Sequence, residues 1–227
     1  MEIYKKQELD EHYNKIFLQN RQKLLSGGIG DPFLTAPEAD TRMALALLIR
    51  IGPEVSANIS RYLEELKKAE PGLYYYPDED FHITVMDILR GEPGRKIPER
   101  IDDYIRCVRS CAAGIRPFQI TFDGAAASDN AVMIKGYYEE ELERLRVSLR
   151  KELAEQGLLL EERYQTFSAH VTAVRIPKRL EHAAEFLSHI ETERAFGQMK
   201  AEALELVFHN WYDSKKTVLD RVKLKER

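Results

Sequence analysis

The chain has 227 residues and a formal net charge of −4, and 44% of its residues are hydrophobic and 32% charged. These values are ordinary for a soluble globular protein, and the small acidic net charge argues against a surface that grips long nucleic acid. No apolar run of about 18 residues occurs, and the first residues lack the apolar core of a signal peptide, so the sequence predicts a cytoplasmic protein without a membrane span.

Residues 4–25 carry apolar side chains at helical spacing, which predicts a helix with one face to bury. The glycine-rich stretch 27–32 breaks this helix, and the polar residues up to Thr41 predict a loop. No later segment repeats this part of the chain. We therefore expect residues 1–40 to form an N-terminal helical extension that packs on a domain formed by residues 41–227.

The first half of that domain is predicted to alternate strands with amphipathic helices. Residues 43–51 are nearly all apolar, which is typical of a strand covered on both faces. Pro53 is suited to begin a helix, because its missing N–H would be unpaired there. In chain order, the sequence predicts a strand at 43–51, a helix that begins at Pro53 and is ended by Pro71 and Gly72, a short strand at 73–76, a strand at 81–88 and a helix that spans Ile101 to Val108.

The second half repeats this order of elements. It begins with residues 118–123, whose alternating apolar and polar side chains predict a strand with one solvated face. Next come a predicted strand at 131–135, a helix at 139–156, a strand at 169–176, a helix at 180–190 and a closing hairpin with strands 203–212 and 217–224. The repeated order predicts an α+β, bilobal fold, in which two pseudo-symmetric lobes of antiparallel strands, flanked by helices, face a central cleft.

Two stretches of the chain share a motif. Residues 81–88 read FHITVMDI, and residues 169–176 read AHVTAVRI. The shared residues are His82 and Thr84 in the first stretch and His170 and Thr172 in the second. Because residues i and i+2 of a strand share a face, each stretch projects an imidazole and a hydroxyl side by side. If the two strands are neighbours, both HxT motifs converge on the central cleft.

Two imidazoles and two hydroxyls in one cleft suit in-line displacement at phosphorus. The unperturbed pKa of histidine is about 6.5, so one imidazole can be neutral and the other protonated near neutral pH. One histidine would take a proton from the attacking water and the other would protonate the leaving ribose oxygen. The threonine hydroxyls would donate to non-bridging phosphate oxygens. The sequence leaves open which histidine is the base and which is the acid.

The paired motifs and the order of elements resemble the two-histidine (2H) phosphoesterase superfamily, and within it the 2′,5′ RNA ligase-like and cyclic phosphodiesterase proteins. The resemblance covers residues 43–224 and implies a bilobal α+β fold with metal-independent hydrolysis or ligation at 2′,3′ or 2′,5′ phosphates of RNA type. The matching motif positions are His82 and His170 as catalytic residues and Thr84 and Thr172 as phosphate-binding residues. The chain departs from the family pattern where VMDILR follows the first motif, since many members have an apolar run that ends in glycine.

Aromatic side chains near the predicted strand ends are candidates for stacking on a base. These candidates are Tyr76, Tyr164, Phe167 and Trp211. Aromatic side chains at strand ends are equally common as core and rim residues, so the sequence is compatible both with a packing role and with stacking on a base.

The other histidines and the cysteines have structural interpretations. His12 lies on a charged helix face and is expected to be solvated, and His209 is expected to be partly buried and hydrogen-bonded. Cys107 and Cys111 lie four residues apart on a predicted helix, which favours core thiols over a disulfide. Arg175 falls on the strand face opposite the second motif and is expected to point away from the cleft unless the strand twists or bulges there.

The leading hypothesis is a metal-independent phosphodiesterase that hydrolyses 2′,3′-cyclic or 2′,5′-linked phosphates of a nucleotide or RNA end, with the ligase direction left open. The alternative is a module of the same fold that binds a nucleotide or RNA end without turnover. A metal-dependent hydrolase is a third hypothesis, and it fits less well because no carboxylate or cysteine recurs beside His82 or His170 at ligand spacing. We expect no cofactor, no metal, no membrane partner, no long nucleic acid, and a monomer.

Overall fold

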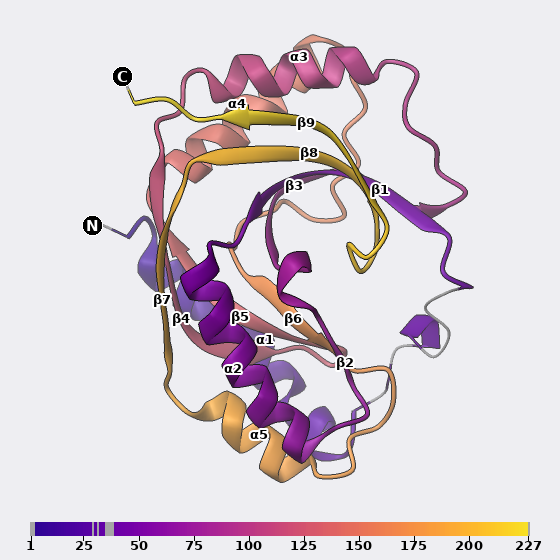
Figure 1. The fold of residues 1–227 in the computed structure, drawn as a ribbon, viewed down its shortest axis with the longest axis vertical. Coiled ribbons are helices and arrows are strands. Elements are labelled where there is room, and N and C mark those ends of the chain that lie inside the picture. Colours follow the sequence, from indigo (N-terminus) through magenta and orange to yellow (C-terminus); the bar gives the residue numbers. More distant parts are fainter. Residues whose placement is uncertain (1–2, 29, 31, 35–38, 227) are drawn as a thin grey trace.

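The structure, a computed structural model, describes residues 3–28, 30, 32–34 and 39–226 (Figure 1). In this part of the chain, nine strands form one curled antiparallel sheet with five α-helices around it. The helices are α1 (Lys6–Leu25), α2 (Pro53–Ala69), α3 (Ile101–Ala112), α4 (Glu141–Glu155) and α5 (Ala183–Glu191). The strands are β1 (Arg42–Arg50), β2 (Tyr74–Tyr75), β3 (His82–Pro93), β4 (Phe118–Ala127), β5 (Ala131–Tyr138), β6 (Val171–Arg175), β7 (Ala195–Ala201), β8 (Ala203–Asn210) and β9 (Lys216–Lys223).

The sheet consists of two similar halves. Its strand order is β7-β4-β5-β6-β3-β1-β8-β9, with β2 paired to β6. The units β1-α2-β3 and β5-α4-β6 are equivalent, and their last strands, β3 and β6, are neighbours in the middle of the sheet. The predicted α+β class and the antiparallel strands are confirmed, and the two predicted lobes are the two halves of this continuous sheet.

Two helices pack across the sheet: α2, which lies between β1 and β3 in the chain, and α4, which lies between β5 and β6, each contact a strand of the other half. Helix α2 contacts β7 and α5 contacts β4, while α4 contacts β3 and α3 contacts β9. Thus α1, α2 and α5 gather at one end of the molecule, and α3 and α4 pack together at the other (Figure 1). Each half therefore depends on the other for the burial of its apolar face, which ties the two central strands into one unit.

Burial alternates along the central strands. Ile83, Val85, Val171 and Ala173 are all 0% exposed and belong to the main core. β1 is covered on both faces as predicted, since Leu45 and Leu47 lie in the main core, while Ala46, Leu48 and Val207 form a separate small apolar cluster. This second cluster forms an apolar surface next to the partly exposed residues of β3.

Helix α1 is bound to the backbone next to the second motif. The fully buried hydroxyl of Tyr13 donates to the carbonyl of Gly136 at 3.0 Å and accepts from the Gly136 N–H at 3.2 Å. A Cβ atom on Gly136 would lie 2.0 Å from the carbonyl oxygen of Ala169, the residue before His170. Glycine is therefore required at position 136 because the two backbones approach so closely. Through its hydrogen bonds to Gly136, α1 also helps to fix the backbone that precedes the second histidine.

We expect Gly136→Ala to lower the free energy of unfolding by roughly 2 kcal/mol, because the added methyl must displace backbone rather than a flexible side chain. Denaturant unfolding measures this loss. Gly91→Ala is the matched control, since the nearest atoms to a Cβ at this strand glycine are 3.8 Å away. Equal stability of the two variants would contradict the close approach at Ala169.

The other predicted helices and strands are confirmed, with one omission, while part of the loop predicted up to Thr41 lies outside the described residues. Strand β7 was not predicted, because its residues alternate weakly and contain Gly197 at φ +102°. Cys107 and Cys111 are free and buried, as expected. Among the described residues, no helix is both long and apolar enough to cross a membrane.

Candidate active site

The two HxT motifs meet at the seam between β3 and β6. Ile83 and Val171 are in register there, and one step along an antiparallel ladder places Thr84 opposite His170 and Thr172 opposite His82. The four motif side chains are partly exposed, whereas the residues that alternate with them are fully buried. The structure thus brings all four predicted residues to one face of the sheet, on either side of one seam.

Arg146 of α4 holds the seam together from the buried side. Its side chain is 0% exposed, and it donates to backbone carbonyls of the two motif strands and their approach. These acceptors are Thr84 O at 3.1 Å, Val85 O at 2.9 Å, Phe167 O at 2.7 Å and Ser168 O at 2.7 Å. Since β3 and β6 share so short a ladder, this guanidinium supplies hydrogen bonds that fix the distance between the motifs.

The two histidines are oriented by residues two positions earlier in the chain. The Nδ1 atom of His82 lies 2.8 Å from the carbonyl oxygen of Asp80. A carbonyl only accepts, so Nδ1 carries the hydrogen and Nε2 is left with a lone pair in the neutral ring. The Nδ1 atom of His170 lies 2.8 Å from Oγ of Ser168, which can donate or accept. Ser168 and His170 lie two residues apart just before β6, and this S-x-H-x-T spacing is the signal that sequence reasoning missed.

Both imidazoles are neutral at neutral pH in this structure. Burial is the main cause that lowers the pKa of His82 to about 4, and it has the same effect on His170, whose pKa also falls to about 4. The charge of His82 lowers the pKa of His170 further, as expected of two neighbouring imidazoles. The expectation of one neutral and one protonated ring near pH 7 is therefore wrong for the free protein, because it used the unperturbed pKa.

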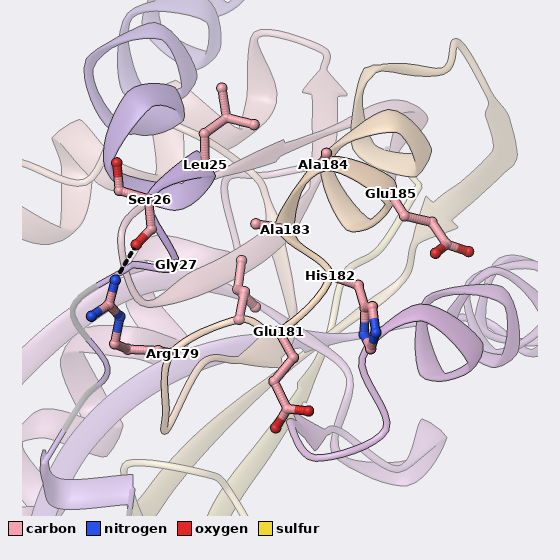
Figure 2. Close-up of a pocket in the computed structure, with 10 residues that line it drawn as sticks. Leu25, Ser26, Gly27, Arg179, Glu181, His182, Ala183, Ala184 and Glu185 are labelled. Atoms are coloured by element: carbon pink, nitrogen blue, oxygen red, sulfur yellow. Dashed lines mark hydrogen bonds between the residues drawn. The ribbon is translucent and has the colours of Figure 1, made fainter.

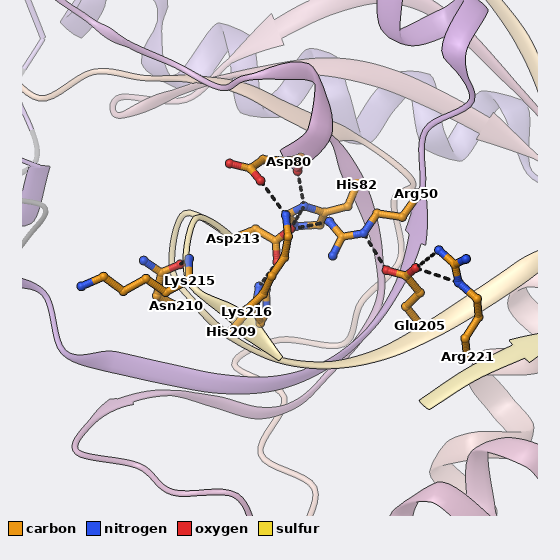
Figure 3. Close-up of polar contacts among 10 residues, drawn as sticks. All are labelled: Arg50, Asp80, His82, Glu205, His209, Asn210, Asp213, Lys215, Lys216 and Arg221. Atoms are coloured by element: carbon orange, nitrogen blue, oxygen red, sulfur yellow. Dashed lines mark hydrogen bonds and ion pairs between the residues drawn. The ribbon is translucent and has the colours of Figure 1, made fainter. Parts of the chain in front are cut away.

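A charged network surrounds His82 (Figure 3). Asp213 Oδ2 lies 3.9 Å from Nδ1 of His82, and Lys216 Nζ lies 2.6 Å from Asp80 Oδ1. Arg50, which is opposite His82 in the register of β1 with β3, bonds to Glu205 at 2.8 Å and also to Asp213. None of these residues was predicted. Asp80 precedes His82 by two residues, and the others come from β1, from β8 and from the turn that leads into β9 and the start of that strand.

The candidate stacking residues have different surroundings. Tyr76 is 4% exposed and its hydroxyl accepts from Arg175 at 3.2 Å, so its ring has no free face and does not fit the predicted role. The ring of Trp211 already carries the guanidinium groups of Arg42 and Arg175, 4.9 and 5.1 Å from its centroid. Tyr164 is 67% exposed and remains available for stacking.

Phe167 and His12 pack together near the second motif. Their rings meet edge to face, with centroids 5.6 Å apart. His12 is therefore half-buried rather than solvated, and burial is the main cause that lowers its pKa. The charges of Arg175 and His12 both lower the pKa of His170. β6 pairs irregularly with β5 just before Arg175, so the regular strand on which the expectation for its direction depended is not present there.

A separate hollow of about 640 Å³ lies between the end of α1 and the start of α5 (Figure 2). Its walls include Gly27, Arg179 and His182 but none of the four motif residues. Within the described ranges, no group of three or more His, Cys, Asp or Glu side chains is arranged to hold a metal ion.

A profile of the 2′-5′ RNA ligase superfamily matches residues 55–212. The match covers more than half of the chain, and the chain therefore belongs to the 2′-5′ RNA ligase superfamily of 2H phosphoesterases. None of the curated proteins compared with the chain matches it significantly.

Solved structures have the same fold. TT0787 of Thermus thermophilus is 20% identical, with a TM-score of 0.54 over 81% of this chain and 97% of that chain. E. coli LigT complexed with 3′-AMP is 16% identical, with a TM-score of 0.58 over 82% of this chain and 99% of that chain. LigT complexed with phosphate is 15% identical, with a TM-score of 0.53 over the same shares, 82% and 99%. At these identities the likeness concerns the fold.

Proposed function

We propose that the chain is a phosphodiesterase of its superfamily that hydrolyses a 2′,3′-cyclic or 2′,5′-linked phosphate at a nucleotide or RNA end. His82 and His170 are the proposed acid–base pair, and Thr84 and Thr172 the proposed phosphate-binding residues. The observation that carries the proposal is the register between β3 and β6, which sets the two motifs across one seam on one face of the sheet.

The proposed reaction needs two proton transfers and a place for the phosphate charge. A water oxygen forms a bond to phosphorus while one imidazole takes its proton, and the other imidazole protonates the ribose oxygen whose bond to phosphorus breaks. The two threonine hydroxyls donate to the non-bridging oxygens, on which charge grows in the transition state. Antiparallel placement supports this scheme, because each histidine lies opposite the threonine of the other motif.

One imidazole must gain a proton before this reaction, since both are neutral in the free protein near pH 7. The pKa of each ring is about 4, and an anionic phosphate ester beside the pair raises the pKa of both rings. The burial that disfavours a charged ring thus couples its protonation to substrate binding.

We therefore expect kcat/KM to rise as the pH falls from 8 to 6, by up to about tenfold per pH unit, because the singly protonated pair becomes more populated. Initial rates with 2′,3′-cyclic AMP across this range measure the slope. A flat profile, or a rate that falls toward acid, would contradict low pKa values for the pair.

The activity itself is tested by hydrolysis of 2′,3′-cyclic AMP and of 2′,5′-linked ApA in the presence of EDTA. Turnover that survives EDTA supports the proposed chemistry, and loss of turnover on chelation would favour the metal-dependent hypothesis. Incubating an RNA 2′,3′-cyclic phosphate end with a 5′-hydroxyl end tests the ligase direction in the same buffer.

The alternative is binding without turnover. It is supported by the neutral state of both imidazoles and by fold relatives that hold nucleotides, such as E. coli LigT complexed with 3′-AMP. Tight binding of 3′-AMP by calorimetry, together with no hydrolysis of either substrate between pH 5 and pH 8, would favour this alternative.

A further inference from the structure

The turn between β8 and β9 places a carboxylate beside His82. Asp213 is 0% exposed, and its backbone has φ 59°, a left-handed conformation that few residues other than glycine adopt. A fully buried carboxylate in this turn is a feature that the proposed acid–base pair does not by itself explain.

The side-chain partners of this carboxylate are cations and imidazoles (Figure 3). They are His209 Nδ1 at 2.8 Å, Lys216 Nζ at 3.1 Å, Arg50 through a short hydrogen bond, and His82 Nδ1 at 3.9 Å. Burial acts to raise the pKa of Asp213, but the hydrogen bonds from His209 and Arg50 outweigh it and hold that pKa well below its usual range. The group is therefore a permanent negative charge beside the first motif.

The two histidines lie in different electrostatic surroundings. His209 and Arg50 oppose a positive charge on His82. The Asp213 carboxylate and the Asp80 carbonyl both favour a protonated His82. The strongest charges on His170 come from Arg175, His12, His82 and Arg146, which are all positive when charged, and Nδ1 of His170 contacts a hydroxyl. The pseudo-symmetry of the sheet thus does not extend to the electrostatics of the two motifs.

We propose that Asp213 is a positioning residue of the active site, and that its charge selects His82 as the imidazole that becomes protonated when a phosphate ester binds. This inference rests on the proposed function. His82 then donates its Nε2 proton to the leaving ribose oxygen, and neutral His170 accepts a proton from the water whose oxygen bonds to phosphorus. Solvent restores both rings after product release.

Other charged groups also face His82 and must be considered in the test. They are Arg50 on β1, Asp80 before β3, His170 across the seam, His209 on β8, and Lys216 at the start of β9. Arg50 and a charged His209 oppose protonation of His82, whereas Asp213 favours it. Removing one of these charges should therefore shift the pKa of His82 in a direction given by the sign of that charge.

The test is an NMR titration of the histidine ring resonances in Asp213→Asn and Lys216→Met. Asparagine has the same shape as aspartate and tolerates positive φ, so the turn is retained. We expect Asp213→Asn to lower the pKa of His82 by about one unit and to leave His170 nearly unchanged. Lys216 is exposed, and its removal unmasks the carboxylates, so Lys216→Met should shift the pKa of His82 upward.

At pH 7, Asp213→Asn should also lower kcat about tenfold, with KM changed less than about twofold.

Asp220→Asn is the matched control. Asp220 lies in the same hairpin but pairs with Arg109 of α3 at 2.7 Å. An unchanged pKa of His82 in Asp213→Asn, or an equal shift in Asp220→Asn, would overturn the inference. If Asp213→Asn does not fold, Lys216→Met decides alone, and no upward shift of His82 would reject the proposal. These titrations need no substrate, so their result is independent of whether the proposed activity is found.

Discussion

Replacement of His170 by alanine is expected to lower kcat for a 2′,3′-cyclic nucleotide by about 10³-fold, and replacement of His82 to do the same. Positioned acid or base groups contribute about 10²- to 10⁴-fold each, and the proposed reaction needs both. The two side chains are partly exposed and lie outside the main core, so the fold should be retained. Single-turnover rates with purified variants of native-like circular dichroism measure the effect.

His182→Ala is the control for these two variants. His182 is exposed and lines the hollow beside α5, not the seam. It should retain full activity, which would also exclude that hollow as the place of reaction. If both motif variants turn over at the rate of the unchanged protein, the chemistry lies elsewhere on the molecule.

Arg146→Met is expected to have the largest effect on stability. The change leaves four carbonyl acceptors of the motif strands without their donor, and a hydrogen bond to a charged group is worth about 1.5–3 kcal/mol. Because the freed carbonyls can relax in part and a buried charge is removed, we expect a net loss of roughly 3 kcal/mol. Urea denaturation followed by tryptophan fluorescence measures it.

The Arg146→Met variant should also lose activity, even under conditions in which it remains folded. The reason is that the Arg146 side chain bonds to both motif segments, through Thr84 and Val85 on one side and Phe167 and Ser168 on the other. Arg144→Met on the exposed face of α4 should change stability by less than about 0.5 kcal/mol. A variant of Arg146 that keeps both full stability and full activity would show that the seam holds without this side chain.

The local features of the site were predictable from the sequence, because they depend on short spacing. A histidine and a threonine two residues apart on a strand must share a face, and the repeated order of elements indicated that the two strands are equivalent. The structure places both motifs at the middle of one sheet, which meets the condition that the two strands be neighbours.

The supporting residues were not predictable, because distant parts of the chain supply them. Arg146 lies at helical spacing from Leu142 and Leu149 on the buried face of α4, but this spacing does not reveal which backbone carbonyls the fully buried arginine binds. Asp213 lies in a stretch whose polar residues predict a turn, yet it is buried against β1 and β3. The lowered pKa values of His82 and His170 likewise follow from burial, which only the packed fold determines.

A crystal structure with adenosine 2′-monophosphate, the product of opening the proposed cyclic substrate at its 3′ oxygen, tests the central claim most directly. The account predicts a phosphate at the seam between β3 and β6, within hydrogen-bond distance of both imidazoles and both threonine hydroxyls. A phosphate bound in the hollow beside α5, with the seam of the sheet left empty, would contradict it.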